Sequence, residues 1–245
     1  MVDDCIDAVP RRSTLALDSM EMAAAGFEAL GFLVVPGVLD AATCDTVAAQ
    51  KDELPLAGAG TRQLLRIEWC RLLAHSVRTH LAIRELLPPD SVGVQCTLFN
   101  KTPSANWLVA LHQDRSVPVR VKVNSYGLVG WSQKEGAIFV QPTVALLQQL
   151  TAVRVHIDPC PAESGALRVV PGSHRMGVLS TAEADQARRE SPEQVVPVSR
   201  GGALLMKPLL LHASSKAAVS IQRRVLHFVF GAPVPPSGLA WQYAI

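Results

Sequence analysis

The spacing of hydrophobic positions changes near residue 90. Before this point, helix-forming residues run in long stretches between stop and start signals, such as Gly31 after the first stretch and the N-cap residue Asp40 before the second. A short, continuous apolar run between them is typical of a buried strand. We therefore expect the first third to be mostly helical, with helices over residues 20–30, 41–54 and 63–87 and a strand over residues 32–35.

After residue 90 the apolar runs become short, rich in Val, Leu and Phe, and separated by turn residues. Runs of this kind predict strands rather than helices. A chain of helices followed by many strands favours an antiparallel sandwich or barrel that helices brace on one side. The expected strands are residues 92–99, 108–111, 117–123, 153–157, 167–170, 203–206 and 224–230.

One long stretch, residues 176–201, interrupts these strands. Ser180 and Glu183 have the spacing of a capping box, which predicts a short helix beginning there. A long connection between strands is often a lid over a binding site, whereas a solvated surface helix would give the same pattern. Both interpretations of the segment stay open.

The composition indicates one folded domain. The chain has 245 residues, of which 49% are hydrophobic and 18% charged, so it can bury a large core without disulfides or metals to hold it. We expect a single domain over residues 1–245, with a leader over 1–18, a mostly helical support over 19–90, a β core over 91–232 and a C-terminal tail over 233–245.

Charge and cysteine usage exclude several classes of protein. A net charge of +2 offers no basic field for nucleic acid and no polybasic patch for a membrane surface. The apolar runs stay below the roughly 18 residues that span a bilayer, and the first residues lack a secretory signal. Five scattered cysteines without a C-x-x-C pair argue for reduced, buried thiols. We expect a soluble, cytoplasmic protein whose partner is a small molecule.

The tripeptide His112-Gln113-Asp114 carries the sharpest chemical signal. On a strand, residues i and i+2 point to the same face, so this imidazole and this carboxylate can converge on one point. Two histidines and one carboxylate form the facial set that holds Fe(II) and leaves open positions for reactants. Taken alone, the tripeptide is better explained by a strand-end histidine beside a turn aspartate, so the metal interpretation requires a second histidine.

That second histidine has to come from another strand. His212 is the favoured candidate, because it follows the apolar run over residues 203–211 at the end of a predicted strand. His174, in a Pro-Gly-Ser-His turn, is the next candidate as a ligand or base, although a structural loop histidine is the preferred interpretation there. His156 alternates within its strand and is expected either to pack in the core or to lie behind the metal ligands.

Arg223 opens the last predicted strand. A guanidinium inside a mostly apolar barrel needs an anionic partner, because an unpaired buried charge is costly. The far carboxylate of a dicarboxylate cosubstrate is such a partner and can be bound by two parallel hydrogen bonds. Arg224 would then point to the opposite face. An ion pair with Asp or Glu, or a solvent-facing position, is the alternative for Arg223.

Five separated segments resemble, in their order, the pattern of the phytanoyl-CoA dioxygenase family over about residues 25–232. The resemblance implies an Fe(II)- and 2-oxoglutarate-dependent oxygenase on a double-stranded β-helix, a jelly-roll or cupin-like fold that is mainly β with flanking helices. Here the N-terminal helices would brace it. The segments are Asn100-Lys101-Thr102-Pro103, His112-Gln113-Asp114, Pro171-Gly172-Ser173-His174, His212-Ala213-Ser214 and Arg223-Arg224.

The same resemblance implies a role for each matching residue. His112, Asp114 and His212 would be the iron ligands and the catalytic centre, and Arg223 would bind the distal carboxylate of 2-oxoglutarate. O2 would be the third reactant, with succinate and CO2 as co-products. Relatives that halogenate carry a small residue at the position of Asp114, so its carboxylate favours hydroxylation, or another oxidation such as desaturation or ring formation. The residues implied to help line the cosubstrate pocket are Ser214, Lys101 and Gln113.

The substrate is expected to be a small molecule oxidised at an unactivated C–H bond. Four residues around the His-x-Asp segment are candidates to contact it: Trp107, Arg115, Tyr126 and Trp131.

Two alternatives belong to other classes of function. The chain could be a non-catalytic, cupin-like binder of small molecules, or a zinc-dependent hydrolase that uses the same His-Asp-His set. Arg223 discriminates between the oxygenase and the hydrolase, because hydrolysis has no evident need for an inward arginine beside the metal.

Overall fold

The computed structural model describes residues 14–54, 60–219 and 222–245. Most of the expected leader, residues 1–13, lies outside the described residues. Its remaining part was predicted wrongly, because helix α1 (Thr14–Leu30) begins at residue 14 and includes it. Leu30 is followed by Gly31 at a φ of +82°, a left-handed conformation that ends the helix as predicted.

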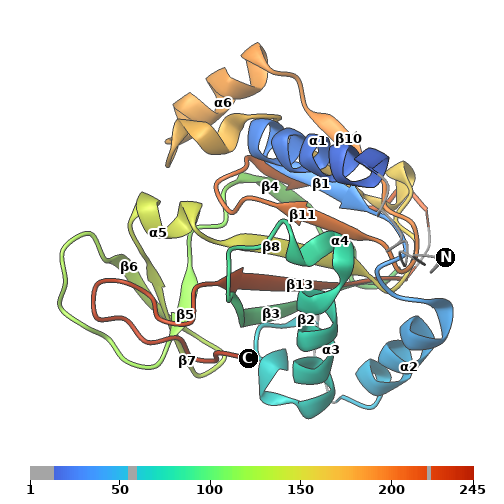
Figure 1. Ribbon diagram of the computed structural model, residues 1–245, viewed down its shortest axis with the longest axis horizontal. Coiled ribbons are helices and arrows are strands. Elements are labelled where there is room, and N and C mark those ends of the chain that lie inside the picture. The colour runs from blue at the N-terminus through green and yellow to red at the C-terminus, as the bar shows by residue number, and fades with distance from the viewer. Residues whose placement is uncertain (1–13, 55–59, 220–221) are drawn as a thin grey trace, which may run out of the picture.

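Two antiparallel sheets face each other across a shared apolar core and form the β-helix (Figure 1). The expectation of a double-stranded β-helix that is mainly β is confirmed. The six-stranded sheet has the order β1 (Phe32–Val35), β11 (Ala203–Met206), β8 (Thr151–His156), β13 (Arg223–Gly231), β3 (Val92–Lys101) and β2 (Gly60–Thr61). The four-stranded sheet has the order β10 (Gln194–Val196), β9 (Leu167–Val169), β12 (His212–Ser214) and β4 (Val109–His112).

A third sheet lies beside this core, in the order β5 (Val117–Val119), β7 (Ala137–Gln141) and β6 (Val129–Lys134). Helix α5 (Val144–Gln148) and the C-terminal tail pack with it into a second apolar cluster that includes Leu147 and Trp241. The main chain of Ile245 exchanges two hydrogen bonds with Gly93, so the tail is tied to the first residues of β3.

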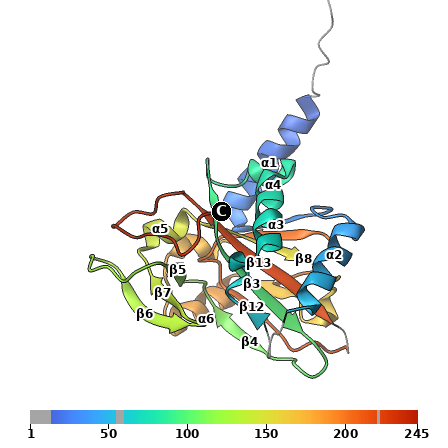
Figure 2. The ribbon, with the colours of Figure 1, turned by 90° about the horizontal axis from the view of Figure 1, so that it is seen from below.

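Helices cover the outer face of the six-stranded sheet (Figure 2). Phe27 of α1, Val47 of α2 (Ala41–Asp52), Val77 of α3 (Glu68–Thr79) and Ile83 of α4 (Leu81–Arg84) are buried in one cluster with strand residues such as Phe228. This cover explains why every residue of β8 is buried: one side of that central strand faces the helices and the other faces the barrel interior. The interior is therefore shielded from water at its back.

The expected helix over residues 63–87 is the main error of the sequence analysis. The segment forms a short 3-10 helix, η1 (Leu64–Arg66), followed by α3 and α4. Ile67 and His80 separate the three pieces with extended backbone, at ψ angles of 134° and 130°. These breaks change the direction of the chain, so that Leu64, Val77 and Ile83 all reach the same core.

The predicted strands are found, most of them with ends shifted by one or two residues, whereas 117–123 shrinks to β5. Strands β6, β7, β10 and β12 and helix α5 were not expected. Most of β6 is exposed, so it lacks the alternation of buried and exposed residues that identifies a strand. Strands β10 and β12 have three residues each, which is too short for a recognisable pattern. The long connection holds the expected helix, α6 (Thr181–Glu190), and Ser180 and Glu183 form the predicted capping box.

In the described ranges, no helix combines the length and the apolar character needed to cross a membrane. Cys44, Cys70, Cys96 and Cys160 are buried there with free thiols, as expected; Cys5 lies outside the described residues.

Candidate functional site

Strands β4 and β12 bring the two favoured histidines together. His112 is the last residue of β4 and His212 the first of β12, and the two are directly paired in the ladder. Asp114 follows two residues after β4, where its N–H donates to the carbonyl of Pro208 at 2.9 Å. Asp114 Oδ1 lies 3.7 Å from His112 Nε2, and Oδ2 lies 3.8 Å from His212 Nε2. One ligand atom from each residue falls within 4.8 Å of the others, the geometry of a metal site.

Both histidines present the same nitrogen to this site. Nδ1 of His112 lies 2.8 Å from the carbonyl of Ala110, and Nδ1 of His212 lies 2.9 Å from the carbonyl of Leu210. A carbonyl only accepts, so Nδ1 carries the proton in each neutral ring and Nε2 keeps its lone pair. Histidines that hold metals are usually oriented by such a bond from the other ring nitrogen. The donor set therefore fits a divalent metal.

The charge states also suit a metal. Burial, with smaller contributions from His112 and Arg154, lowers the pKa of His212 to about 4, so its ring is neutral at neutral pH. Burial would raise the pKa of Asp114, but the neighbouring imidazoles of His212, His112 and His227 outweigh it and hold this pKa far below its usual value. For His112 burial lowers the pKa, and Asp114 more than offsets it, so the net shift is upward. Neutral imidazoles and an ionised carboxylate are the forms that bind metals.

Three cationic side chains are buried inside the same barrel. Lys101, Arg154 and Arg223 are 1%, 5% and 3% exposed, and none of them forms an ion pair with an acidic residue of the described chain. The Nε atoms of Arg154 and Arg223 are buried without a hydrogen-bond partner. Because an unpaired buried charge is costly, this arrangement calls for an anion that is not part of the protein.

Lys101 and Arg223 lie next to each other on paired strands, β3 and β13. Lys101 Nζ donates to Ser214 Oγ at 3.0 Å and to the carbonyl of Ser215 at 2.6 Å, and Arg223 donates to the carbonyl of Gly165. Burial and the neighbouring Arg223 charge lower the pKa of Lys101 to about 8. A narrow cavity of about 60 Å³ joins these cations to the metal-binding residues; its lining includes Lys101, His112, Asp114, Arg154, His212, Ser214 and Arg223.

Arg224, the next residue along β13, has a different environment. Its guanidinium donates to both carboxylate oxygens of Asp158, at 2.8 and 2.7 Å. The predicted opposition of the two arginines is therefore found: Arg223 faces the barrel interior and Arg224 an acidic partner outside it.

Three further residues lie near this site: Arg154, which sequence reasoning missed, and His156 and His227, which it did not favour as ligands. All three are buried and face the interior, and neither nitrogen of His156 has a hydrogen-bond partner. Burial, together with the charges of Arg154 and Arg223, holds the pKa of His156 well below its usual value. The sequence feature that could have indicated Arg154 is its position as a charged residue within an otherwise apolar, strand-forming run.

Of the four predicted substrate contacts, two line a cavity and two do not. Trp107 lines the narrow cavity, with Lys101 Nζ 5.5 Å from its ring centre, whereas Arg115 lines a neighbouring cavity. Tyr126 is 99% exposed and Trp131 packs against the third sheet, so neither reaches these cavities.

Gln113 does not lie where the resemblance implied. Its amide N–H groups donate to the carbonyls of Gly177 and Leu209 at 2.7 and 2.8 Å, and its amide oxygen accepts from Leu179 N–H at 2.9 Å. Strand alternation is the reason: Gln113 points away from the face that His112 and Asp114 share. The side chain therefore anchors the 176–201 connection and does not line the narrow cavity.

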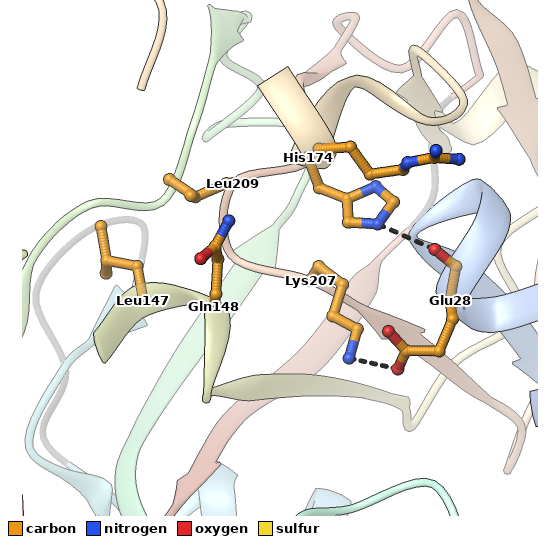
Figure 3. Close-up of a pocket in the computed structure, with 7 residues that line it drawn as sticks. Glu28, Leu147, Gln148, His174, Lys207 and Leu209 are labelled. Atoms are coloured by element: carbon orange, nitrogen blue, oxygen red, sulfur yellow. Dashed lines mark hydrogen bonds and ion pairs between the residues drawn. The ribbon is translucent and has the colours of Figure 1, made fainter. Parts of the chain in front are cut away.

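His174 lies in a separate pocket of about 300 Å³ (Figure 3). Its Nε2 is 3.1 Å from the carbonyl of Glu28, and Lys207 forms an ion pair with the Glu28 carboxylate at 2.6 Å. His174 thus connects its loop to α1, in agreement with a structural loop histidine, and is not among the grouped metal-binding residues.

Solved structures with the same fold include metal- and 2-oxoglutarate-dependent enzymes. The epimerase SnoN of nogalamycin biosynthesis, in complex with Fe3+, alpha ketoglutarate and nogalamycin RO, is similar with a TM-score of 0.68 and 18% identity over 91% of this chain and 88% of that one. HygX from Streptomyces hygroscopicus, with nickel, 2-oxoglutarate and hygromycin B bound, matches with a TM-score of 0.62 and 18% identity over 86% of each chain. AviO1 from Streptomyces viridochromogenes Tue57 matches with a TM-score of 0.60 and 21% identity over 89% of this chain and 96% of that one.

A search of curated protein sequences found no significant match. The family model described as phytanoyl-CoA dioxygenase (PhyH), in contrast, matches residues 27–225, which contain every residue of the candidate metal site. The chain belongs to the phytanoyl-CoA dioxygenase family, the family of Fe(II)- and 2-oxoglutarate-dependent oxygenases that its sequence resembles.

Proposed function

We propose that the protein is a non-haem Fe(II)- and 2-oxoglutarate-dependent dioxygenase that hydroxylates a small molecule at an unactivated C–H bond. The observation that carries the proposal is the narrow cavity in which two histidines and an aspartate lie beside buried cations without an acidic partner. Iron and 2-oxoglutarate, when bound, would supply the oxidising chemistry with O2, with succinate and CO2 as co-products.

In this proposal the protein holds the metal by one face. Nε2 of His112, Nε2 of His212 and a carboxylate oxygen of Asp114 would be the ligands, which leaves the opposite positions open to reactants. The backbone bonds from Nδ1 fix both rings before metal binding. Asp114 adds the one negative charge of the set and occupies the position that a halide would need, which favours hydroxylation.

The buried cations would orient the cosubstrate. Arg223, with Lys101 and Ser214 beside it, would bind the distal carboxylate of 2-oxoglutarate. Arg154 contacts His227, whose Nε2 lies 3.6 Å from Asp114 Oδ2. Helices behind the six-stranded sheet and the apolar cluster inside the barrel exclude water from this end. A dry, preorganised cavity keeps the oxidising step on the substrate.

SnoN is an epimerase and SnoK a carbocyclase, both from nogalamycin biosynthesis, and HygX has hygromycin B bound. These similar structures support a small-molecule substrate here. Hydroxylation is therefore the part of our proposal that goes beyond these comparisons. A product that is heavier than the substrate by one oxygen atom would identify it.

Metal and cosubstrate titrations test the proposal. Anaerobic Fe(II) protein should develop a metal-to-ligand charge-transfer band with 2-oxoglutarate, and aerobic protein should form succinate. His112→Ala, Asp114→Ala and His212→Ala should each lose iron binding and turnover while their circular dichroism is unchanged. His75→Ala, at an exposed histidine of α3, is the matched control. Full iron occupancy in His212→Ala would contradict the ligand set, and turnover with zinc but not iron would favour a hydrolase.

A further inference from the structure

A second cavity, of about 440 Å³, opens on the other side of the metal-binding strand. It lies between the end of β4 and helix α6, and His112 contributes to its wall as well as to that of the narrow cavity. A molecule in this cavity would therefore contact a strand that carries one of the candidate metal-binding residues, His112. Its lining includes Arg115, Leu179, Thr181, Asp185 and Arg188.

The wall of this cavity is held in place. Gln113, which stands between two of the candidate metal ligands, makes three hydrogen bonds to backbone groups of Gly177, Leu179 and Leu209. Ala184 and Ala187 of α6 are buried against Leu211 of the sheet. The helix is thus fixed relative to the metal-binding strand, and the cavity is a formed pocket of a size typical for small ligands.

The charge of the lining is positive. Arg115 is half-buried and forms neither a hydrogen bond nor an ion pair with any described residue. Asp185 is the one acidic residue among the described residues that line the cavity, and it is already paired with Arg188 at 3.4 Å. The hydroxyl group of Thr181, at the start of α6, adds a donor, whereas the Ser180 hydroxyl is engaged with Glu183 in the capping box. A half-buried guanidinium without a partner favours an anionic group on the ligand.

We propose that this cavity binds the substrate and that Arg115, with Arg188 at its rim, binds a carboxylate or phosphate group of that substrate. The cavity would then select anionic small molecules over neutral or cationic ones of the same shape. The role of the bound molecule as substrate rests on the proposed oxygenase function, whereas its binding does not.

Matched probes of one shape test the charge preference on the metal-free protein. Cyclohexanecarboxylate and cyclohexyl phosphate are the anions, and cyclohexanecarboxamide and cyclohexylmethylamine are the neutral and cationic counterparts, with binding followed by ligand-observed NMR. Arg115→Gln should weaken the preferred anion about tenfold, the effect of losing one charge-assisted pair, and leave the amide unchanged. Arg188→Gln should have a smaller effect, and Arg120→Gln, an exposed arginine that does not line the cavity, should have none.

Three outcomes would overturn the proposal: equal binding of the amide and the anions, no binding of either anion at millimolar concentration, or anion binding that is lost in Arg223→Ala but kept in Arg115→Gln. The last result would place the probes in the narrow cavity instead. Because this experiment uses no metal and no 2-oxoglutarate, its result is separate from the charge-transfer titration. If the charge-transfer titration failed while the cavity still preferred the anionic probes, the proposed oxygenase function would be wrong and the proposed anion site would stand.

Discussion

Nη1 of Arg154 lies 2.9 Å from Nδ1 of His227. A guanidinium only donates, so Nδ1 is the acceptor and the proton of the neutral ring must be on Nε2. That Nε2 faces Asp114, 3.6 Å from Oδ2, which is also the oxygen nearer to His212. Arg154 thus sets the tautomer of His227, and His227 offers a proton toward the carboxylate of the candidate metal site.

His227→Leu should therefore weaken metal binding by roughly tenfold, because Asp114 loses the group that orients it, and outer partners of metal ligands typically contribute 10–100-fold. Competition with a chromophoric chelator measures this affinity. His227→Gln, which keeps a donor and an acceptor, should restore part of the loss, and His75→Leu on exposed α3 should change nothing. Unaltered affinity in His227→Leu would show that Asp114 is positioned by its backbone alone.

The metal-free protein should lose stability as the pH falls. Burial, only partly offset by Asp114, lowers the pKa of His212 to about 4 and that of His227 to about 3, against 6.5 for an exposed histidine. Below pH 6.5 the unfolded chain therefore binds protons that the folded chain does not, and the free energy of unfolding decreases until the folded pKa values are reached. We expect a loss of about 3 kcal/mol between about pH 7.5 and 5.5 from these two groups.

Urea unfolding at the two pH values measures this loss. His227→Leu should remove about half of what these two groups contribute, whereas buried His156, whose pKa is also held low, keeps its own contribution. A free energy of unfolding that stays constant over this range would contradict the buried, neutral state of both rings.

The closeness of His112 to Asp114 and the inward position of Arg223 were predictable because both depend on local alternation. His112 and Asp114 share a face through the two-residue period of a strand, and Arg223 and Arg224 are separated by the same period. His212 needed more, since only the pairing of β12 with β4 places it beside His112. The family resemblance supplied that long-range information.

Other features could not be read from the sequence. Arg154 lies in a strand, where an isolated charge usually faces water, and only the sheets around β8 make its side chain face the interior. The break at Ile67 and the one at His80 have no side-chain cap to announce them. In both cases the burial of distant residues decides the local conformation.

Affinity for 2-oxoglutarate should fall as the pH rises through about 8. Burial and the Arg223 charge lower the pKa of Lys101 to about 8, so the free protein loses this cation in the alkaline range, whereas a bound carboxylate would keep it protonated. Binding is then linked to proton uptake, and the affinity should decrease by up to about tenfold for each pH unit above the pKa. Charge-transfer titrations at several pH values measure it.

Lys101→Met is the variant that assigns this effect. It should bind 2-oxoglutarate more weakly below pH 8 and show no dependence above it, because the titrating group is absent. A pH dependence that persists in Lys101→Met would attribute the effect to another group.

Arg223 and Arg224 form a matched pair for separating cosubstrate binding from metal binding. The Arg223 guanidinium is buried without an acidic partner, whereas Arg224 is held by Asp158. Removing one partner of a buried charge pair costs about 2–5 kcal/mol, so Arg223→Ala should weaken 2-oxoglutarate by roughly 30-fold or more. Arg224→Ala should have a much smaller effect, and neither change should alter iron affinity, because neither guanidinium is a ligand.

Anaerobic titration of 2-oxoglutarate into the iron form, followed by its charge-transfer band, compares the two variants directly. Iron affinity is measured separately with a chelator, so a variant that merely unfolds is recognised by the loss of both. If Arg224→Ala were the damaging change, the anion would lie on the outer face of β13. If neither variant mattered, Lys101 and Arg154 would have to hold the dicarboxylate between them, since they are the other two buried cations of the described interior.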